Sequence, residues 1–238
     1  MLKKLGVIAA LFFLVGCAKQ PEDVSTKEVG IMSGLIQDVK WLGHAGIKIT
    51  GDKVVYMDPY KIKGDEPADI ILITHEHYDH CSPDDVAKIL KNDTAIITVA
   101  DCQSKLNKLD SPMTLVKPGD RLKVKGIRIE VTPAYNIDKQ FHPKENSWVG
   151  FVVEMNGKRY YHAGDTDFIP EMAQLKNIDV AFLPIGGTYT MDAAKAANAA
   201  NTIKAKITVP IHYGSIVGSR EDAERFKRLV NGEVIIFG

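Results

Sequence analysis

One stretch of seven residues, Thr74-His75-Glu76-His77-Tyr78-Asp79-His80, constrains the chain more than any other. It holds three of the seven histidines in the chain, together with two carboxylates. The apolar run Asp69–Ile73 precedes it and is typical of a buried strand. Ser82-Pro83-Asp84-Asp85 follows as a helix start, with Ser82 as N-cap and Asp85 in the position of a capping-box acid. We therefore expect the cluster on a strand-to-helix loop, at the carboxyl end of a strand, where open α/β folds bind their ligands.

The spacing inside this cluster points to metal binding. Imidazoles at positions i, i+2 and i+5 with a carboxylate at i+4 are hard to explain by solvation of a loop, and they suit zinc, or alternatively manganese or iron. Two later elements have the same character: Asp165 follows a strand on a glycine-preceded loop, and His212 ends an apolar strand. Alone, each would be a weak signal. Together with the cluster they indicate a site for two divalent metal ions.

Composition limits the remaining possibilities. The chain has 238 residues and a formal net charge of zero, so it can form one domain and shows no electrostatic signature of nucleic-acid binding. After Cys17, discussed below, the cysteines are Cys81 and Cys102. We expect these two to be free or simply packed, although an exported protein could oxidise them if they lie within reach.

The first residues have the features of an export signal. Lys3 and Lys4 precede an apolar stretch too short to span a bilayer, which ends in Leu14-Val15-Gly16-Cys17, a sequence similar to a bacterial lipobox. This predicts a signal peptide at 1–16, a lipid on Cys17, a tether at 17–32 and a folded domain at 33–238 in the cell envelope. An ordinary signal peptide with an incidental cysteine is the alternative.

The folded part reads as two successive blocks, each a strand meander followed by alternating strands and helices. In the second block Asn156-Gly157 has the favoured composition of a type I′ hairpin turn. Ser219 and Asp222 form a capping box ahead of the last helix. Two facing sheets with helices outside are expected, an α+β fold with four αββα layers. The helices are expected at 83–90, 169–175, 190–205 and after 219, and the later strands at 95–100, 121–125, 127–132, 149–155, 159–162, 179–183, 207–211 and 233–237.

The combined motif resembles that of the metallo-β-lactamase-fold hydrolases. It comprises His75-x-His77-x-Asp79-His80, then Gly164-Asp165-Thr166, then His212, and covers nearly all of 33–238. Further segments resemble the ascorbate-6-phosphate lactonase-like branch and related uncharacterised hydrolases. These segments are Leu42-Gly43-His44, Tyr161-His162-Ala163-Gly164-Asp165-Thr166, Leu183-Pro184-Ile185-Gly186-Gly187-Thr188-Tyr189-Thr190-Met191 and Pro210-Ile211-His212-Tyr213-Gly214.

The resemblance implies a distribution of ligands. One metal would be held by His75, His77 and a third histidine. The other would be held by Asp79, His80 and His212, with Asp165 bridging the two ions.

The third histidine departs from the family pattern. Related sequences often carry it in an Ala-x-His stretch, which here reads Ala134-Tyr135-Asn136. His142 follows six residues later, and we expect it to replace the missing ligand. Weak coordination by Asn136, or a site with a single metal, is the alternative.

Several neighbours receive secondary roles. His44 lies near two glycines, and it either lines the site as a substrate contact or is structural. His162 is expected to support the site or pack. Glu76 and Tyr78 alternate with the ligands and should point away from the metals. Gly187, with its neighbour Gly186, and Tyr189 are candidate substrate contacts.

The expected activity is metal-dependent hydrolysis of a small-molecule ester, lactone or phosphodiester, with a metal-bound hydroxide as nucleophile. Asp79 would act both as ligand and as proton acceptor or donor. A serine nucleophile is not expected because the chain has no Gly-x-Ser-x-Gly motif. The alternative is a lipoprotein of the same fold that binds metal or ligand and has lost catalysis.

Overall fold

The structure, a computed structural model, describes residues 34–64 and 66–238. The predicted signal peptide at 1–16, the tether at 17–32 with Cys17, and Ser33 lie outside the described residues. Among the residues that are described, none of the helices is both long and apolar enough to span a bilayer.

The first half of the chain forms a six-stranded sheet in the order β1-β2-β3-β4-β5-β6. Strands β1 to β3 form an antiparallel meander, and β3 to β6 run parallel to one another. The strands are β1 (Val39–Gly43), β2 (Gly46–Ile49), β3 (Val55–Met57), β4 (Ile70–Leu72), β5 (Ala95–Thr98) and β6 (Met113–Leu115).

The second half repeats this plan in a seven-stranded sheet with the order β13-β12-β11-β10-β9-β8-β7. Strands β7 to β10 form the meander, and β10 to β13 run parallel. The strands are β7 (Arg121–Val124), β8 (Ile127–Pro133), β9 (Val149–Met155), β10 (Lys158–His162), β11 (Val180–Pro184), β12 (Ile207–Ile211) and β13 (Glu233–Val234). The two predicted blocks, each a meander followed by alternating elements, are thus confirmed.

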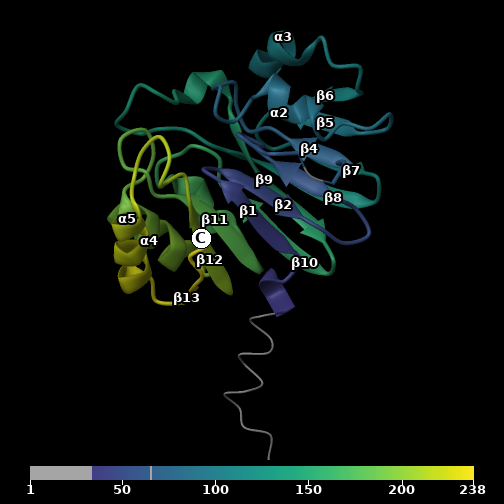
Figure 1. Cartoon of the computed structure of the whole chain (residues 1–238). Coiled ribbons are helices and arrows are strands. Elements are labelled where there is room, and N and C mark those ends of the chain that lie inside the picture. Colours follow the sequence, from purple (N-terminus) through teal and green to yellow (C-terminus); the bar gives the residue numbers. More distant parts are fainter. Residues whose placement is uncertain (1–33, 65) are drawn as a thin grey trace, which may run out of the picture.

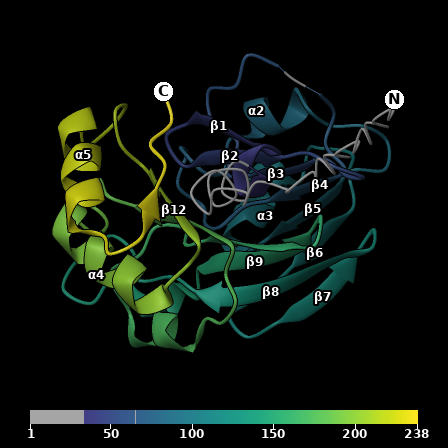
Figure 2. The ribbon, with the colours of Figure 1, turned by 90° about the horizontal axis from the view of Figure 1, so that it is seen from below.

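The sheets face each other and the helices lie outside them (Figure 1; Figure 2). Figure 2 shows α2 beyond the first sheet, and α4 and α5 beside the second. This is the predicted four-layer arrangement. The α-helices are α2 (Pro83–Ala87), α3 (Gln103–Leu106), α4 (Ala193–Ile203) and α5 (Arg220–Leu229), and 3₁₀ turns lie at η1 (Ala100–Cys102), η2 (Lys144–Asn146) and η3 (Pro170–Gln174).

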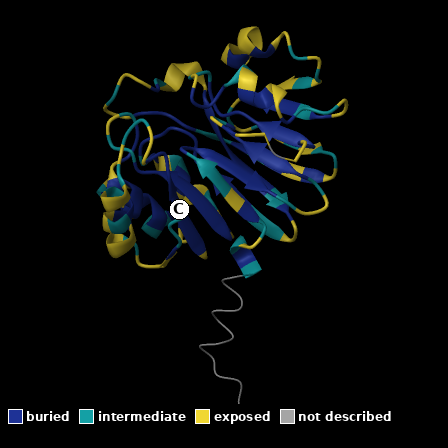
Figure 3. Ribbon diagram, viewed as in Figure 1, coloured by how far each residue is buried: buried dark blue, intermediate teal, exposed yellow. Residues whose placement is uncertain are grey.

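Two apolar cores follow from this layering. Alternate residues of β11 belong to different cores: Val180 and Phe182 pack between the sheets, whereas Ala181 and Leu183 pack under the helices. Strands buried on both faces explain why β4, β11 and β12 read as continuous apolar runs. Figure 3 shows the buried strands surrounded by exposed loops and outer helix faces.

The local signals are borne out unevenly. Ser219 and Asp222 form the predicted capping box, and both residues of the Asn156-Gly157 turn have positive φ. The first helix ends at Ala87 instead of residue 90. The Asp85 carboxylate accepts hydrogen bonds from the backbone N–H groups of Lys61 and Ile62, so it ties down a loop instead of completing a capping box.

Several element ends differ from the prediction. The expected helix at 169–175 is a 3₁₀ turn, the alanine-rich helix is shorter at both ends, and the last strand has two residues. These ends depend on tertiary hydrogen bonds that periodicity does not report.

Candidate metal centre

The candidate ligands come from loops that follow strands of both sheets. The segment after β4 carries His75 to His80, and the loop after β8 carries His142. Asp165 follows β10, and His212 follows β12. Because these strand ends meet at one edge of the sandwich, residues more than 130 positions apart in the sequence converge.

The first set of ligands consists of His75, His77 and His142, whose ligand atoms all lie within 4.8 Å of one another. The Nε2 atom of His75 and the Nδ1 atom of His77 are 3.1 Å apart. His142 brings its ring into this group, and the choice between His142 and Asn136 as metal ligand stays a prediction. The side chain of Asn136 lies behind His142.

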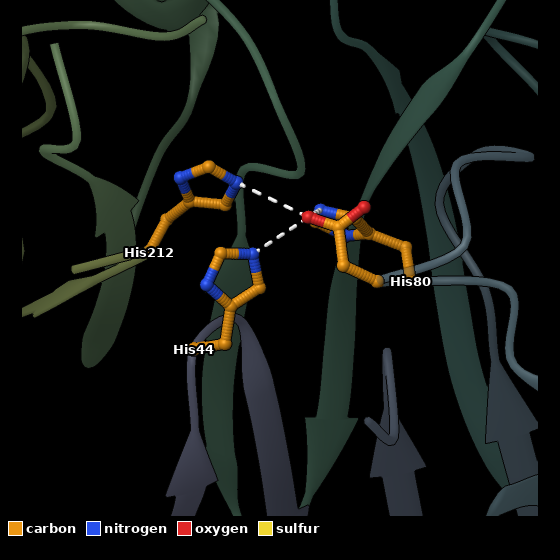
Figure 4. Close-up of side chains that lie close together, drawn as sticks. His44, His80 and His212 are labelled. Atoms are coloured by element: carbon orange, nitrogen blue, oxygen red, sulfur yellow. Dashed lines mark hydrogen bonds and ion pairs between the residues drawn. The ribbon is translucent and has the colours of Figure 1, made fainter. Parts of the chain in front are cut away.

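The second set consists of Asp79, His80 and His212, and His44 joins it within the same 4.8 Å limit. The Nε2 atoms of His80 and His212 lie 3.7 and 3.9 Å from Asp79 Oδ2. Figure 4 shows that His44 and His212 lie on one side of this set and His80 lies on the other.

Asp165 lies between the two sets. Its Oδ2 atom is 3.3 Å from His142 Nε2 and 3.0 Å from His212 Nε2, and its Oδ1 atom is 3.4 Å from His80 Nε2. The carboxylate therefore reaches one histidine of the first set and two of the second. A carboxylate in this position can bridge two ions.

The atoms aimed into this space fit metal ions. Among the described residues, the buried side-chain atoms without a hydrogen-bond partner include His80 Nε2, His142 Nε2, His212 Nε2 and Asp165 Oδ1. A buried polar atom without a partner is costly, and such atoms are rare in folded proteins. Four of them converging on one space, all imidazole nitrogens or carboxylate oxygens, make up the donor set that divalent metals prefer.

In His80, His75 and His142 the opposite ring nitrogen is held by a hydrogen bond, which sets the tautomer, whereas the Nδ1 atom of His212 has no partner among the described residues. The Asp58 carboxylate, fully buried, accepts from the Nδ1–H of His80 at 2.8 Å and from the hydroxyl of Thr74 at 2.7 Å. Because that hydroxyl donates to Asp58, it accepts from the Nδ1–H of His75 at 2.9 Å. One carboxylate thus leaves the Nε2 lone pair of two ligands, one from each set, free for a metal. No motif in the sequence singles out Asp58; its place directly after β3 and before Pro59 is the one available signal.

His142 is held differently. Its Nδ1–H faces the Asn136 side-chain oxygen at 3.1 Å and the Tyr189 backbone oxygen at 3.2 Å. Asn136 also accepts from the backbone N–H of His142 and donates to the Tyr189 oxygen. The residue at the position of the expected family histidine therefore orients His142, the predicted replacement.

His44 contacts a ligand and does not line the pocket described below. Its Nε2 lies 2.8 Å from Asp79 Oδ2, while its backbone oxygen accepts from the N–H of His212. His44, Asp58 and His212 all have φ between 45° and 60°, in the left-handed region that non-glycine residues rarely adopt. Such strain, about 1–2 kcal/mol for each residue, tends to persist at functional sites. Substrate contact by His44 stays a prediction.

The electrostatics keep the carboxylates ionised. Burial raises the pKa of Asp79, but the hydrogen bond from His44 and the charge of His80 outweigh it and lower the pKa to about 2. Burial acts in the same direction on Asp165, yet the neighbouring His212 and His80 hold its pKa well below the usual value. Burial lowers the pKa of His75, whereas Asp165 and Asp58 raise the pKa of His80 despite burial. Burial thus favours the neutral form of His75, and a metal bound by the second set would compete with a proton for His80.

The remaining candidates take supporting positions. His162 is fully buried and its Nε2 donates to the Ala45 backbone oxygen, which agrees with support or packing. Glu76 points outward to Lys105 at 3.0 Å. Gly187 has a φ of +81°, and its N–H donates a hydrogen bond to the backbone oxygen of Met191. Gly187 does not line the pocket described below. A Cβ on Gly186 would lie 2.6 Å from the His212 oxygen, so this glycine is required for close packing of His212.

A pocket of about 230 Å³ opens directly onto the ligands. Tyr189, the candidate substrate contact, lines it, and so does Tyr78, which is exposed above the site and not directed away from it. The full lining is His77, Tyr78, Asp79, Phe141, His142, Asp165, Tyr189, His212 and Ile216. Cys81 and Cys102 are both buried and free, as expected.

Comparison with known proteins agrees with this geometry. The profile of the β-lactamase superfamily domain matches residues 38–212. A UPF0173 metal-dependent hydrolase of Thermoplasma acidophilum is 38% identical over 201 residues, which cover 79% of this chain and 88% of the relative.

Solved structures give the same result. A crystal structure described as that of a metal-dependent hydrolase of Parabacteroides distasonis matches with a TM-score of 0.75 and 36% identity. The match covers 83% of this chain and 91% of the Parabacteroides chain. Igni18, described as a metallo hydrolase of Ignicoccus hospitalis, matches with a TM-score of 0.69 and 25% identity over 84% of this chain and 94% of its own. The chain therefore belongs to the β-lactamase superfamily and is one of its metal-dependent hydrolases.

Proposed function

We propose that the enzyme holds two divalent metal ions, of which zinc is the favoured identity, and that it hydrolyses an ester, a lactone or a phosphodiester. The observation that carries this proposal is the pair of ligand sets that share Asp165, with unsatisfied ligand atoms directed into both. When bound, such ions lower the pKa of water to about 7 and polarise the substrate oxygen. His75, His77 and His142 would hold one ion and Asp79, His80 and His212 the other.

Asp79 is the candidate for proton transfer. It is the carboxylate of the second set, and it also lines the pocket where substrate would enter. Its carboxylate is ionised at neutral pH and lies beside the space for the attacking water, so its position, more than its low pKa, makes it the candidate to take the proton of that water and return it to the leaving oxygen.

His44 is the candidate for positioning Asp79. The Nε2–H of His44 donates to the oxygen of Asp79 that faces His80 and His212. A fixed hydrogen bond on a ligand carboxylate leaves its geometry unchanged during turnover, which favours the reaction by preorganisation.

The first experiment measures bound metal in the purified protein, then hydrolysis of bis-p-nitrophenyl phosphate, a set of lactones and β-lactams. We expect about two ions per chain and turnover of at least one of the first two classes. Asp79→Asn should abolish turnover even at metal concentrations that keep both sites filled. A protein that binds no metal although His75 and His212 are intact would contradict the proposal.

We also propose that the mature chain is anchored to a membrane of the cell envelope through a lipid on Cys17. The lipobox-like Leu14-Val15-Gly16-Cys17 supports this. Metabolic labelling with a fatty acid should mark the full-length protein in the membrane fraction, and Cys17→Ser should remove the label. Labelling that is unchanged by this substitution would contradict the anchor.

A further inference from the structure

From the pocket lining we infer that the substrate carries an uncharged, apolar group directly next to the bond that is cleaved. This inference rests on the proposed function, because it assumes that the reacting group lies on the metals. It concerns the part of the substrate that extends beyond them.

The walls above the ligands are aromatic and aliphatic. Besides five candidate ligands, the pocket is lined by Tyr78, Phe141, Tyr189 and Ile216. The rings of Phe141 and Tyr189 meet edge to face, with centroids 4.8 Å apart and planes at 90°. A group reaching out from the metals would therefore contact apolar surface first.

The exposure of these side chains is unusual for the molecule. Large apolar residues that remain exposed number five in the described part of the chain. Two of them, Tyr78 and Phe141, line this pocket with 63% and 39% of their surface exposed. A third, Ile137, lies on the loop that leads to His142 and is 55% exposed. Exposed apolar side chains gathered at a pocket mark a binding surface.

The charges agree with an uncharged partner. Over the described residues, the pocket lining contains no lysine or arginine. Lysines on neighbouring segments are engaged elsewhere: Lys139 pairs with buried Asp167, and Lys105 pairs with Glu76. Lys61 lies over the ring of Tyr60, 5.0 Å from its centroid. The metals can neutralise an anion at the reacting centre, but a second anionic group in this pocket would find no cation among the lining side chains.

Three hydroxamates test this inference without requiring turnover. Octanohydroxamate and the monohydroxamate of suberic acid have the same metal-binding group and chain length, and differ only in a terminal methyl or carboxylate. Acetohydroxamate lacks the chain. Their dissociation constants are measured by calorimetry on the zinc-loaded protein.

We expect octanohydroxamate to bind about tenfold or more tightly than both others, because burial of a few methylene groups suffices for that factor. Equal binding of the three, or tighter binding of the suberic compound, would overturn the inference alone. Failure of even acetohydroxamate to bind the zinc-loaded protein would overturn the proposed metal site, and the inference with it.

A reversal of preference gives a second test that misfolding cannot imitate. Ile216→Lys places a cation in the lining, and we expect it to make the suberic compound the tighter ligand. Leu115→Lys is the matched control: Leu115 is 42% exposed on β6, outside the pocket, and its substitution should leave all three constants unchanged. An unchanged preference in Ile216→Lys, with acetohydroxamate still bound, would contradict the assignment of this wall to the substrate.

Discussion

The two ligand sets of the metal centre differ in how they are held. In the second set, two members have hydrogen bonds that involve a carboxylate: His80 donates to the buried Asp58 carboxylate, and Asp79 accepts from His44. In the first set, the Nδ1–H of His142 donates to two neutral acceptors, the Asn136 side-chain oxygen and the Tyr189 backbone oxygen. His142 also lies within a loop and not directly after a strand. His75 reaches Asp58 only through the Thr74 hydroxyl.

This difference bears on the strength of the two sites. A carboxylate acceptor raises the basicity of an imidazole ligand more than a neutral acceptor does, and such partners affect metal affinity by about 10–100-fold. The second set also contains its own carboxylate ligand, Asp79, whereas the first shares only Asp165. We therefore expect the second set to bind its ion more tightly, and the first set to lose its ion first.

The largest effect is expected where the two sets meet. Asp165→Asn removes the shared charge from both, so we expect both affinities to fall and activity to drop by at least about 10³-fold. Metal analysis and kinetics on the same preparation measure this. Retention of both ions with only a small loss of activity would show that Asp165 does not bridge.

The next largest effect concerns the buried carboxylate behind the ligands. Asp58→Asn leaves His80 and Thr74 with a weaker acceptor, and we expect a loss of about 10–100-fold in affinity for the second ion. A smaller loss is expected for the first, since His75 is one hydrogen bond further away. The readout is competition with a chelator.

Asp69→Asn is the matched control. Asp69 is also a buried aspartate next to β4, but it accepts from Val54 and Lys91, away from the ligands. Metal affinity in this variant should stay unchanged. Equal losses in the two variants would mean that Asp58 acts on the fold and not on the tautomers.

These residues also show what sequence could and could not predict. The strands and the order of the two blocks were predictable, because strands buried on both faces read as apolar runs and the meanders alternate. His75 to His80 could be assigned as one cluster because their spacing is local. The role of Asp58 could not, since a single aspartate after a strand is usually a turn former and its partners lie 16 and 22 residues away. The contact between Asn136 and His142 depends on the conformation of a loop. Loops lack the repeating hydrophobic pattern from which helices and strands are predicted.

A smaller effect is expected from a substitution that weakens the first ion and leaves the second unchanged. Asn136→Ala removes one of two acceptors from His142 Nδ1, so the first ion should bind about tenfold more weakly while the second is unchanged. A chelator titration should then become more clearly biphasic. Equal weakening of both ions would contradict the separate anchoring of the sets.

The smallest effect is on the stability of the metal-free protein as pH falls. The lowered pKa of His75 and His77 means that the unfolded chain takes up protons first, so stability should decrease below about pH 6.5. The pKa of Asp79, lowered to about 2, adds a further loss between about pH 4 and pH 2. This second loss amounts to about 2 kcal/mol.

Urea unfolding at a series of pH values measures both windows. Asp79→Asn should reduce the loss between pH 4 and pH 2, to which Asp58 and Asp165 also contribute, and keep the loss below pH 6.5. An undiminished loss between pH 4 and pH 2 in the variant would contradict the contribution of Asp79.

The measurement that tests the account most directly is a crystal structure of the zinc-loaded protein. We predict two ions, with the first bound by His142 Nε2 at about 2.0–2.1 Å together with His75 and His77, and with Asp165 touching both. Asn136 should remain hydrogen-bonded to His142 Nδ1. A first ion coordinated by Asn136 with His142 turned away, or a single ion in the centre, would contradict the account.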